Sequence, residues 1–264
     1  SSAASDVYKR QILRVTTSLI MMNRNELDQY LEIIKRVLLN SAVKINEWRE
    51  SFMHEMLLLY LIIPGRINFL QLGCYGRLDE QRYRQQFERK CDRLSFNACL
   101  ADSHTDNLVA IAFDPSYISK SSKCTPYLGR FWSGCAKSTK HGLEISGIGF
   151  IDVDLHNCFH LEAVQTLPAK ILEQVRWTLT DWYLHVLRSR KEILQRLTSH
   201  VVVNAYFSKS SFVAGVLDMG LYVISRFRDD AYFRYLTKDK PTGGKMPQTV
   251  RWENGHEASR RKPF

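Results

Sequence analysis

The sequence predicts an α/β fold in which a mixed sheet is flanked by helices and preceded by an all-α region. Two stretches carry this prediction. The apolar run Leu108–Phe113 leads directly into Asp114, and the run that begins at His200 is β-branched up to Asn204. Apolar runs without polar alternation are typical of strands buried on both faces, in the middle of a sheet covered by helices. The third observation is that segments with helical periodicity precede and separate these strands.

The region before residue 105 is expected to be helical. Apolar residues recur there at i, i+3, i+4 and i+7 spacing, and Pro64-Gly65 and glycines break the pattern. The predicted helices are Asn25–Asn40, Val43–Ile63, Ile67–Leu72 and Asp79–Leu94, with a turn at Gly73–Gly76 before the last one. A helix, a glycine turn and a second helix are the outline of a helix-turn-helix.

The last of these helices is basic and polar. Arginine and glutamine side chains suit contacts with phosphates and base edges in a DNA major groove. The candidate DNA-binding residues are Arg82, Arg84, Gln85, Arg89 and Lys90. The alternative is a solvated charged face on an all-α region. The glycine turn and the basic helix occur together, and this favours DNA contact.

The second half alternates strands and helices. After Leu108–Phe113, the strands Gly142–Val153 and Asn157–Thr166 are expected to form a hairpin around residues 154–156. The remaining predicted elements are a long helix Pro168–Leu197, a strand His200–Phe207, a helix Ser210–Leu217 ended by Gly220, and a strand Leu221–Arg226. Three strands, a helix, a strand, a helix and a strand is the order of the RNase H-like fold.

Asp114 and Asn204 are the candidate catalytic and metal-binding residues. If the strands that they follow lie side by side, both side chains mark the carboxyl ends of neighbouring strands, where ligands bind in open α/β sheets. Oxygen ligands there can hold magnesium or manganese. Asn204 offers only a neutral carbonyl oxygen, so it should bind magnesium less well than an aspartate. The alternative is that Asp114 caps a turn before Pro115, where proline would stop the strand.

The net charge of +10 over 264 residues points to a polyanionic partner, with double-stranded DNA the leading candidate. The alternative is a generally basic protein. The six cysteines form no C-x-x-C pair and are expected to be reduced thiols. The longest apolar run is too short to span a bilayer. The expected location is therefore the cytoplasm, in association with DNA.

Other polar groups have two interpretations each. Asp152 and Asp154 suit either metal binding or a solvated strand end, and the nearby His and Cys residues match no closed zinc site. Lys209 is a candidate phosphate contact, although Ser208 before it suits a helix N-cap. Arg226 and Arg228 suit DNA contact or pairing with the acids that follow them. Two further candidate DNA-binding residues are Lys120 and Lys123.

The segments AIAFDPSYISKSSKC, GRFWSGCAKSTKHGLEISGIGFIDVD, FHLEAVQT and VVVNAYFSKSSFVAGVL closely resemble bacterial insertion-sequence transposases of the DDE type, in order and at the expected spacing over residues 22–245. The resemblance implies an RNase H-like catalytic domain and magnesium-dependent DNA cleavage and strand transfer. It also implies binding to transposon ends and target DNA, a homodimer on DNA, and neither a membrane nor a small-molecule substrate. Asp114 matches the first catalytic aspartate, and Asn204 stands where the second aspartate is expected.

The resemblance also implies a third acid, a glutamate in a C-terminal helix, that has no counterpart here. From about Met246 the sequence loses its periodicity, and a one-base shift of permissible codons restores the family pattern, which predicts a frameshift or truncation. The chain is expected to be inactive as written. The expected segments are a non-native or adaptor-derived leader (1–20), a helical DNA-binding domain (21–105), an incomplete catalytic domain (106–240) and a disordered tail (241–264). The alternatives are a catalytically silent DNA-binding protein and an RNase H-like nuclease that is not a transposase.

Overall fold

The computed structural model describes residues 24–41, 46–105, 108–121, 124–228, 232–234, 249–253 and 256–258. The chain divides into two compact units, Ser1–His104 and Thr105–Phe264. The sequence predicts a boundary one residue later, between residues 105 and 106. The expected leader at 1–20 lies outside the described residues. Among the helices described, none combines the length and apolar character needed to cross a bilayer.

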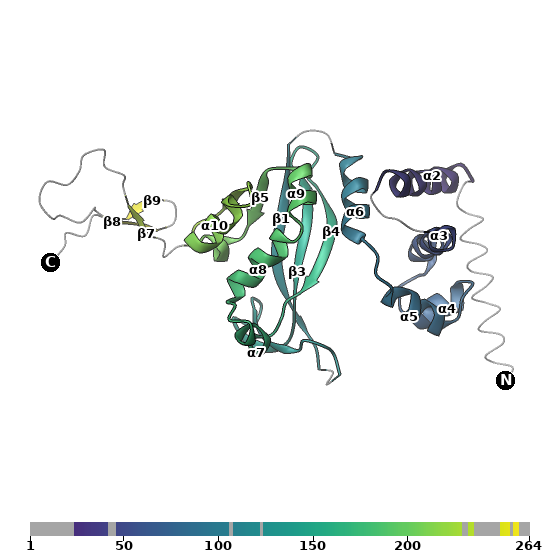
Figure 1. Cartoon of the computed structure of the whole chain (residues 1–264), viewed down its shortest axis with the longest axis horizontal. Helices are drawn as coiled ribbons and strands as arrows, with labels where there is room; N and C mark the ends of the chain where they lie inside the picture. The colour runs from purple at the N-terminus through teal and green to yellow at the C-terminus, as the bar shows by residue number, and fades with distance from the viewer. Residues whose placement is uncertain are drawn as a thin grey trace, which may run out of the picture. The chain divides into compact units, whose positions relative to one another are not determined.

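The first unit contains helices throughout its described residues (Figure 1). They are α2 (Arg24–Asn40), α3 (Glu47–Ile62), α4 (Phe69–Tyr75), α5 (Glu80–Glu88) and α6 (Arg93–Asp102). Each of the last four begins after an Asn or Asp whose side chain accepts a hydrogen bond from a backbone N–H in the first turn. A cluster of Phe52, Met56, Leu59, Leu72 and Tyr83 forms the core under α3, α4 and α5.

Two details of the helical prediction are wrong. Helix α4 continues through Gly73 to Tyr75, so the turn comes later, between Gly76 and Asp79. The predicted helix Asp79–Leu94 is two helices, because Asp92 caps a new one: its Oδ1 accepts the Ser95 N–H over 2.9 Å. The local reason is that a short polar side chain satisfies the free N–H groups at a helix start.

The second unit is built on a mixed six-stranded sheet, so the predicted α/β class is confirmed. Its strands are β1 (Val109–Ser119), β2 (Gly129–Ser133), β3 (Ser138–Asp152), β4 (Asn157–Gln165), β5 (His200–Val203) and β6 (Tyr222–Ser225). They follow the order β2-β3-β1-β5-β6, with β4 also paired to β3. The β1–β5 and β5–β6 pairs are parallel, and the others are antiparallel. The predicted hairpin between β3 and β4 is confirmed.

Strand β1 differs from the prediction because Pro115 does not end it. The strand continues to Ser119, and Pro115 pairs with Ser146 of β3. The parallel pairing with β5 stops earlier, at Phe113↔Val203, so β1 has only one neighbour at the proline and tolerates a missing N–H there. Strand β2 was not predicted. Strand β5 has four residues and passes into the 3-10 helix η1 (Ala205–Phe207), which shortens the predicted strand.

The predicted long helix from Pro168 to Leu197 is wrong, because three helices occupy this range: α7 (Ala169–Gln174), α8 (Leu179–Arg188) and α9 (Lys191–Leu197). Helix α7 ends at Gln174, and Arg176, shortly after it, has a positive φ of 56° that a helix cannot accommodate. Thr178 and Asp181 then form a reciprocal capping box that starts α8. Helix α10 (Ser210–Leu217) has the predicted bounds, and Gly220 follows it with φ +73°.

Helices α7, α8 and α9 lie along one face of the sheet (Figure 1), and α10 packs beside α8. The side chains between sheet and helices are fully buried and largely aromatic, among them Phe113, Phe150, Tyr183, Phe207 and Phe212. The rings of Phe113, Tyr183 and Phe207 meet edge to face at centroid distances of 5.3–5.8 Å. This packing fixes the end of β1 against the end of β5.

A second small sheet lies near the C-terminus. Its strands β7 (Tyr232–Arg234), β8 (Thr249–Glu253) and β9 (His256–Ala258) pair in an antiparallel order. Strands β8 and β9 fall within 241–264, the segment for which the sequence predicts disorder. The other residues of that segment lie outside the described residues.

Candidate functional site

The side chains of Asp114 and Asn204 meet at the point where the pairing of β1 with β5 ends. Phe113↔Val203 is the last parallel pair, so the next residue of each strand is Asp114 or Asn204. Asn204 Nδ2 donates a hydrogen bond to Asp114 Oδ1 over 2.9 Å, across a sequence separation of 90 residues. Neighbouring parallel strands therefore bring the two candidate residues into direct contact.

The orientation of the Asn204 amide is determined by its other partner. Its Oδ1 accepts the backbone N–H of Tyr206 over 2.9 Å, so the amide nitrogen faces Asp114. Ser116 Oγ is within 3.4 Å of the second oxygen of Asp114, and Ser225 Oγ of β6 donates to the Asn204 carbonyl. Two neutral donors, the Asn204 amide and the Ser116 hydroxyl, thus contact the two oxygens of the Asp114 carboxylate.

This donor set does not fit a magnesium ion. A cation at Asp114 needs a second oxygen from position 204, but that position presents N–H hydrogens instead. Within the described residues, no group of three or more His, Cys, Asp and Glu side chains could hold a metal. No such group in the described part of the chain includes His141, His156, Cys158 or His160, the His and Cys residues near Asp152 and Asp154 in the sequence. Asp152 and Asp154 accept backbone N–H groups of Leu155 and Leu108, so they hold the β3–β4 turn and the start of β1.

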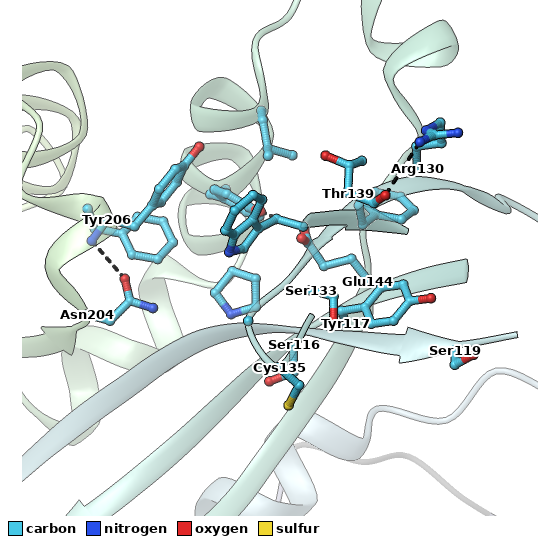
Figure 2. A pocket seen from close by; sticks show the side chains of 17 residues that line it. Ser116, Tyr117, Ser119, Arg130, Ser133, Cys135, Thr139, Glu144, Asn204 and Tyr206 are labelled. Carbon is cyan, nitrogen blue, oxygen red and sulfur yellow. Dashed lines mark hydrogen bonds between the residues drawn. The ribbon is translucent and has the colours of Figure 1, made fainter. Parts of the chain in front are cut away.

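A cavity of about 990 Å³ lies beside this pair and was not predicted from the sequence. Figure 2 shows Asn204 and Tyr206 at one side of it and Arg130 of β2 at the other. Its lining is rich in aromatic side chains and comes from β1, β2, β3, α8 and η1: Tyr117, Phe131, Trp132, Tyr183, Tyr206 and Phe207. Trp132 is 61% exposed, and Tyr206 is 41% exposed.

Glu144 is a buried acid in the wall of this cavity. It lies on β3, and the Tyr183 hydroxyl donates to its Oε1 over 2.6 Å. Burial raises the pKa of Glu144 above its usual value; hydrogen bonds from Tyr183 and Thr166 oppose this, and the charge of Asp114 adds to it. Burial and the charge of Glu144 also raise the pKa of Tyr183. Glu144 is the one acid in the largely apolar and glycine-rich residues 142–151 of β3, and this is the sequence signal for it.

The basic residues predicted to bind DNA are distributed over both units. On and just after α5, the side chains of Arg82, Gln85, Arg89 and Lys90 are exposed. Arg84 is also exposed but pairs with Glu80 over 2.7 Å. Its guanidinium lies 4.7 Å from the centre of the Phe69 ring.

In the second unit, Lys120, Arg226 and Arg228 are exposed, and Lys123 lies outside the described residues. Lys209 Nζ lies 3.9 Å from the centre of the Tyr206 ring, at the side of the cavity. Ser208 does not cap α10, because its Oγ donates to the Ala205 carbonyl and Lys209 precedes the helix.

Together, the fold and the site define an α/β protein whose central parallel strands present one carboxylate and one amide beside an aromatic cavity. No protein-family model matches this chain, and no curated protein shows significant similarity to it.

Proposed function

We propose that this chain is a DNA-binding protein of the DDE transposase type, with an RNase H-like catalytic unit that Asn204 keeps inactive. The observation that carries the proposal is the contact between Asp114 and Asn204 at the ends of the parallel strands β1 and β5. A site for two acids on adjacent central strands is what the resemblance implies. Here one of the two positions carries an amide of nearly the same shape as an aspartate.

The strand arrangement supports the same proposal. Strand β3 runs antiparallel between β4 and β1, and β1, β5 and β6 run parallel in that order. The proposed RNase H-like fold requires its first and fourth long strands to be neighbours, and β1 and β5 are neighbours. The short strand β2, which comes between β1 and β3 in the sequence, is then an addition to the edge of β3 that faces away from β1.

The helical unit supplies the proposed DNA contact. Helices α4 and α5 are joined by a four-residue turn, and they approach so closely that a Cβ on Gly73 would lie 2.8 Å from the Glu80 backbone nitrogen. Helix α5 buries Tyr83 and exposes Arg82 and Gln85, and Arg89 directly after the helix is also exposed. We infer that this exposed face binds duplex DNA and that the protein acts as a homodimer. Its function involves neither a membrane nor a small-molecule substrate.

A gel-shift experiment with duplex DNA tests the DNA-binding part. The affinity should fall steeply as salt rises, because each neutralised phosphate contributes a slope of about −0.9 in log K against log salt. Arg82→Ala and Arg89→Ala should each reduce the magnitude of that slope by about 0.9, the contribution of one phosphate contact. Glu88→Gln, which removes an acid from the same helix, is the matched control and should not reduce it. Binding that does not depend on salt or on these arginines would contradict the proposal.

Direct binding of manganese to the Asn204→Asp variant tests the site. Two facing carboxylates are a better ligand set for a hard cation than one carboxylate and an amide donor. Manganese should therefore bind the variant, and binding should disappear when Asp114→Asn is added. Asn204→Asp with no gain in manganese binding would show that position 204 is not a metal-site position.

The hydrogen bond from Asn204 to Asp114 favours a second candidate, a catalytically silent protein that occupies transposon ends. This protein would bind DNA as above and would not nick it with magnesium or manganese. Nicking of DNA by the unchanged chain would show that the protein is not catalytically silent. Nicking without strand joining would instead indicate a nuclease of the same fold.

A further inference from the structure

The aromatic cavity contains a feature that the Asp114–Asn204 pair does not explain. Trp132 lines it, is 61% exposed, and makes no ring contact with another aromatic side chain of the described residues. A large exposed ring in the wall of a cavity is a surface on which a flat ligand can stack. Tyr206, which also lines the cavity, already carries Lys209 on its ring.

The rest of the lining has the chemistry of a nucleotide site. Arg130 of β2 and Lys209 place positive charge at the sides of the cavity. The carboxyl of Glu144 is in its wall, 6% exposed and held by the Tyr183 hydroxyl (Figure 2). The cavity volume of about 990 Å³ is enough for a base with its sugar. Asn204 lines the cavity and also pairs with Asp114, so a DNA strand bound at the Asp114–Asn204 pair would pass the cavity.

We propose that this cavity binds one unstacked nucleobase of a DNA strand that runs past Asp114 and Asn204, with Trp132 stacking on the base and Glu144 accepting a hydrogen bond from its edge. The inference rests on the proposed function, because it assumes that the chain binds DNA. Proteins that take a base out of the duplex read it by stacking and by hydrogen bonds to its pairing edge.

The chemistry of Glu144 sets the preferred base. Adenine, cytosine and guanine carry an exocyclic amino group whose N–H can donate to a carboxyl oxygen. The pairing edge of thymine has two carbonyl oxygens on either side of one N–H, and these repel a carboxylate. Thymine should therefore be the least favoured base in the cavity.

The test compares a fully paired duplex with duplexes that carry one A, C, G or T opposite an abasic site, where the base leaves the stack at little cost. Stacking on an aromatic side chain should strengthen binding of the unpaired A, C and G duplexes roughly 5- to 100-fold over the paired one. Thymine should gain less. Trp132→Ala should reduce the ratio of unpaired to paired affinity toward one. Tyr222→Ala, an equally exposed aromatic on β6 that does not line the cavity, should keep the ratio.

Glu144→Gln separates the hydrogen bond from stacking. Its amide can donate to a carbonyl as well as accept from an amino group, so the disadvantage of thymine should shrink while the stacking gain stays. If the chain binds the paired duplex but gains nothing from an unpaired base, this inference fails and the proposed function stands. If it binds no DNA at all, the proposed function fails as well. A gain that persists in Trp132→Ala would also overturn the inference.

Discussion

Replacing Asn204 by aspartate should destabilise the sheet and make its stability depend on divalent metal. The change removes the 2.9 Å hydrogen bond to Asp114 and places a second carboxylate against the first. A lost hydrogen bond costs about 1 kcal/mol, and two unit charges about 4 Å apart repel by about 1 kcal/mol in water and about 4 kcal/mol near a protein surface. Both residues are exposed, so the lower values apply. The expected loss without metal is therefore roughly 2 kcal/mol.

Urea unfolding followed by circular dichroism, at neutral pH in a chelator and then in excess manganese, measures this change. Metal bound only by the folded variant should restore stability, by about 2.7 kcal/mol at a concentration one hundred times the dissociation constant. The unchanged chain should show no such restoration. Asn204→Ser is the matched control, because it removes the amide donor without adding a charge.

Two results would refute this reasoning. If Asn204→Asp is no less stable in chelator than Asn204→Ser, the two carboxylates do not repel and the side chains do not meet in solution. If manganese stabilises the unchanged chain as much as the variant, the amide at position 204 does not prevent metal binding. Either result would remove the geometric basis for the proposed catalytic pair.

Three further predictions concern stability. Gly76→Ala should destabilise the full chain by about 1–3 kcal/mol in urea unfolding, because the added Cβ would lie 1.8 Å from Tyr83 Oη; Gly134→Ala, with nothing within 4 Å, should cost much less. Burial raises the pKa of Glu55, but hydrogen bonds from Arg77 and Tyr83 have the larger, opposite effect. The pKa of Glu55 is therefore below its usual value. The ionised Glu55 carboxylate therefore stabilises the fold above the ordinary carboxyl pKa, and this stabilisation is lost as pH falls through the lowered pKa of the folded state. Glu55→Gln should thus flatten the acid side of a plot of unfolding free energy against pH. Tyr183→Phe removes a donor from buried Glu144 and should cost about 1–3 kcal/mol in urea unfolding, whereas Tyr117→Phe, at an exposed bond, should cost less.

The contact between Asp114 and Asn204 could be predicted because its signals are local. Each residue directly follows a short apolar run, and two buried parallel strands that end at the same level bring such residues together. The cavity could not be predicted in this way. It depends on β2, which has five residues, and on which face of β3 carries Glu144. Strand β2 is a short hairpin partner of the start of β3, and the face on which Glu144 lies follows from the register of β3 with β1 and β4.

The broken helix between residues 168 and 197 shows a different limit. An apolar stripe continues through the break, so periodicity alone predicts one element. The capping box of Thr178 and Asp181 is a local signal for a new helix, whereas the apolar periodicity that continues across it indicates a single helix. Pro115 shows the reverse, because a strong local breaker was overridden by an eleven-residue ladder to β3. Pairing over a long strand outweighs one missing hydrogen-bond donor at an edge.

The wide sequence separation between β1 and β5 has a consequence for how the protein folds. The antiparallel meander β1-β3-β4 can form between nearby segments, whereas joining β5 to β1 closes a loop of about 90 residues at a larger cost in chain entropy. We therefore expect the meander to fold early and the junction with β5 to form late. A nascent chain would then acquire the Asp114–Asn204 pair only at the end of folding.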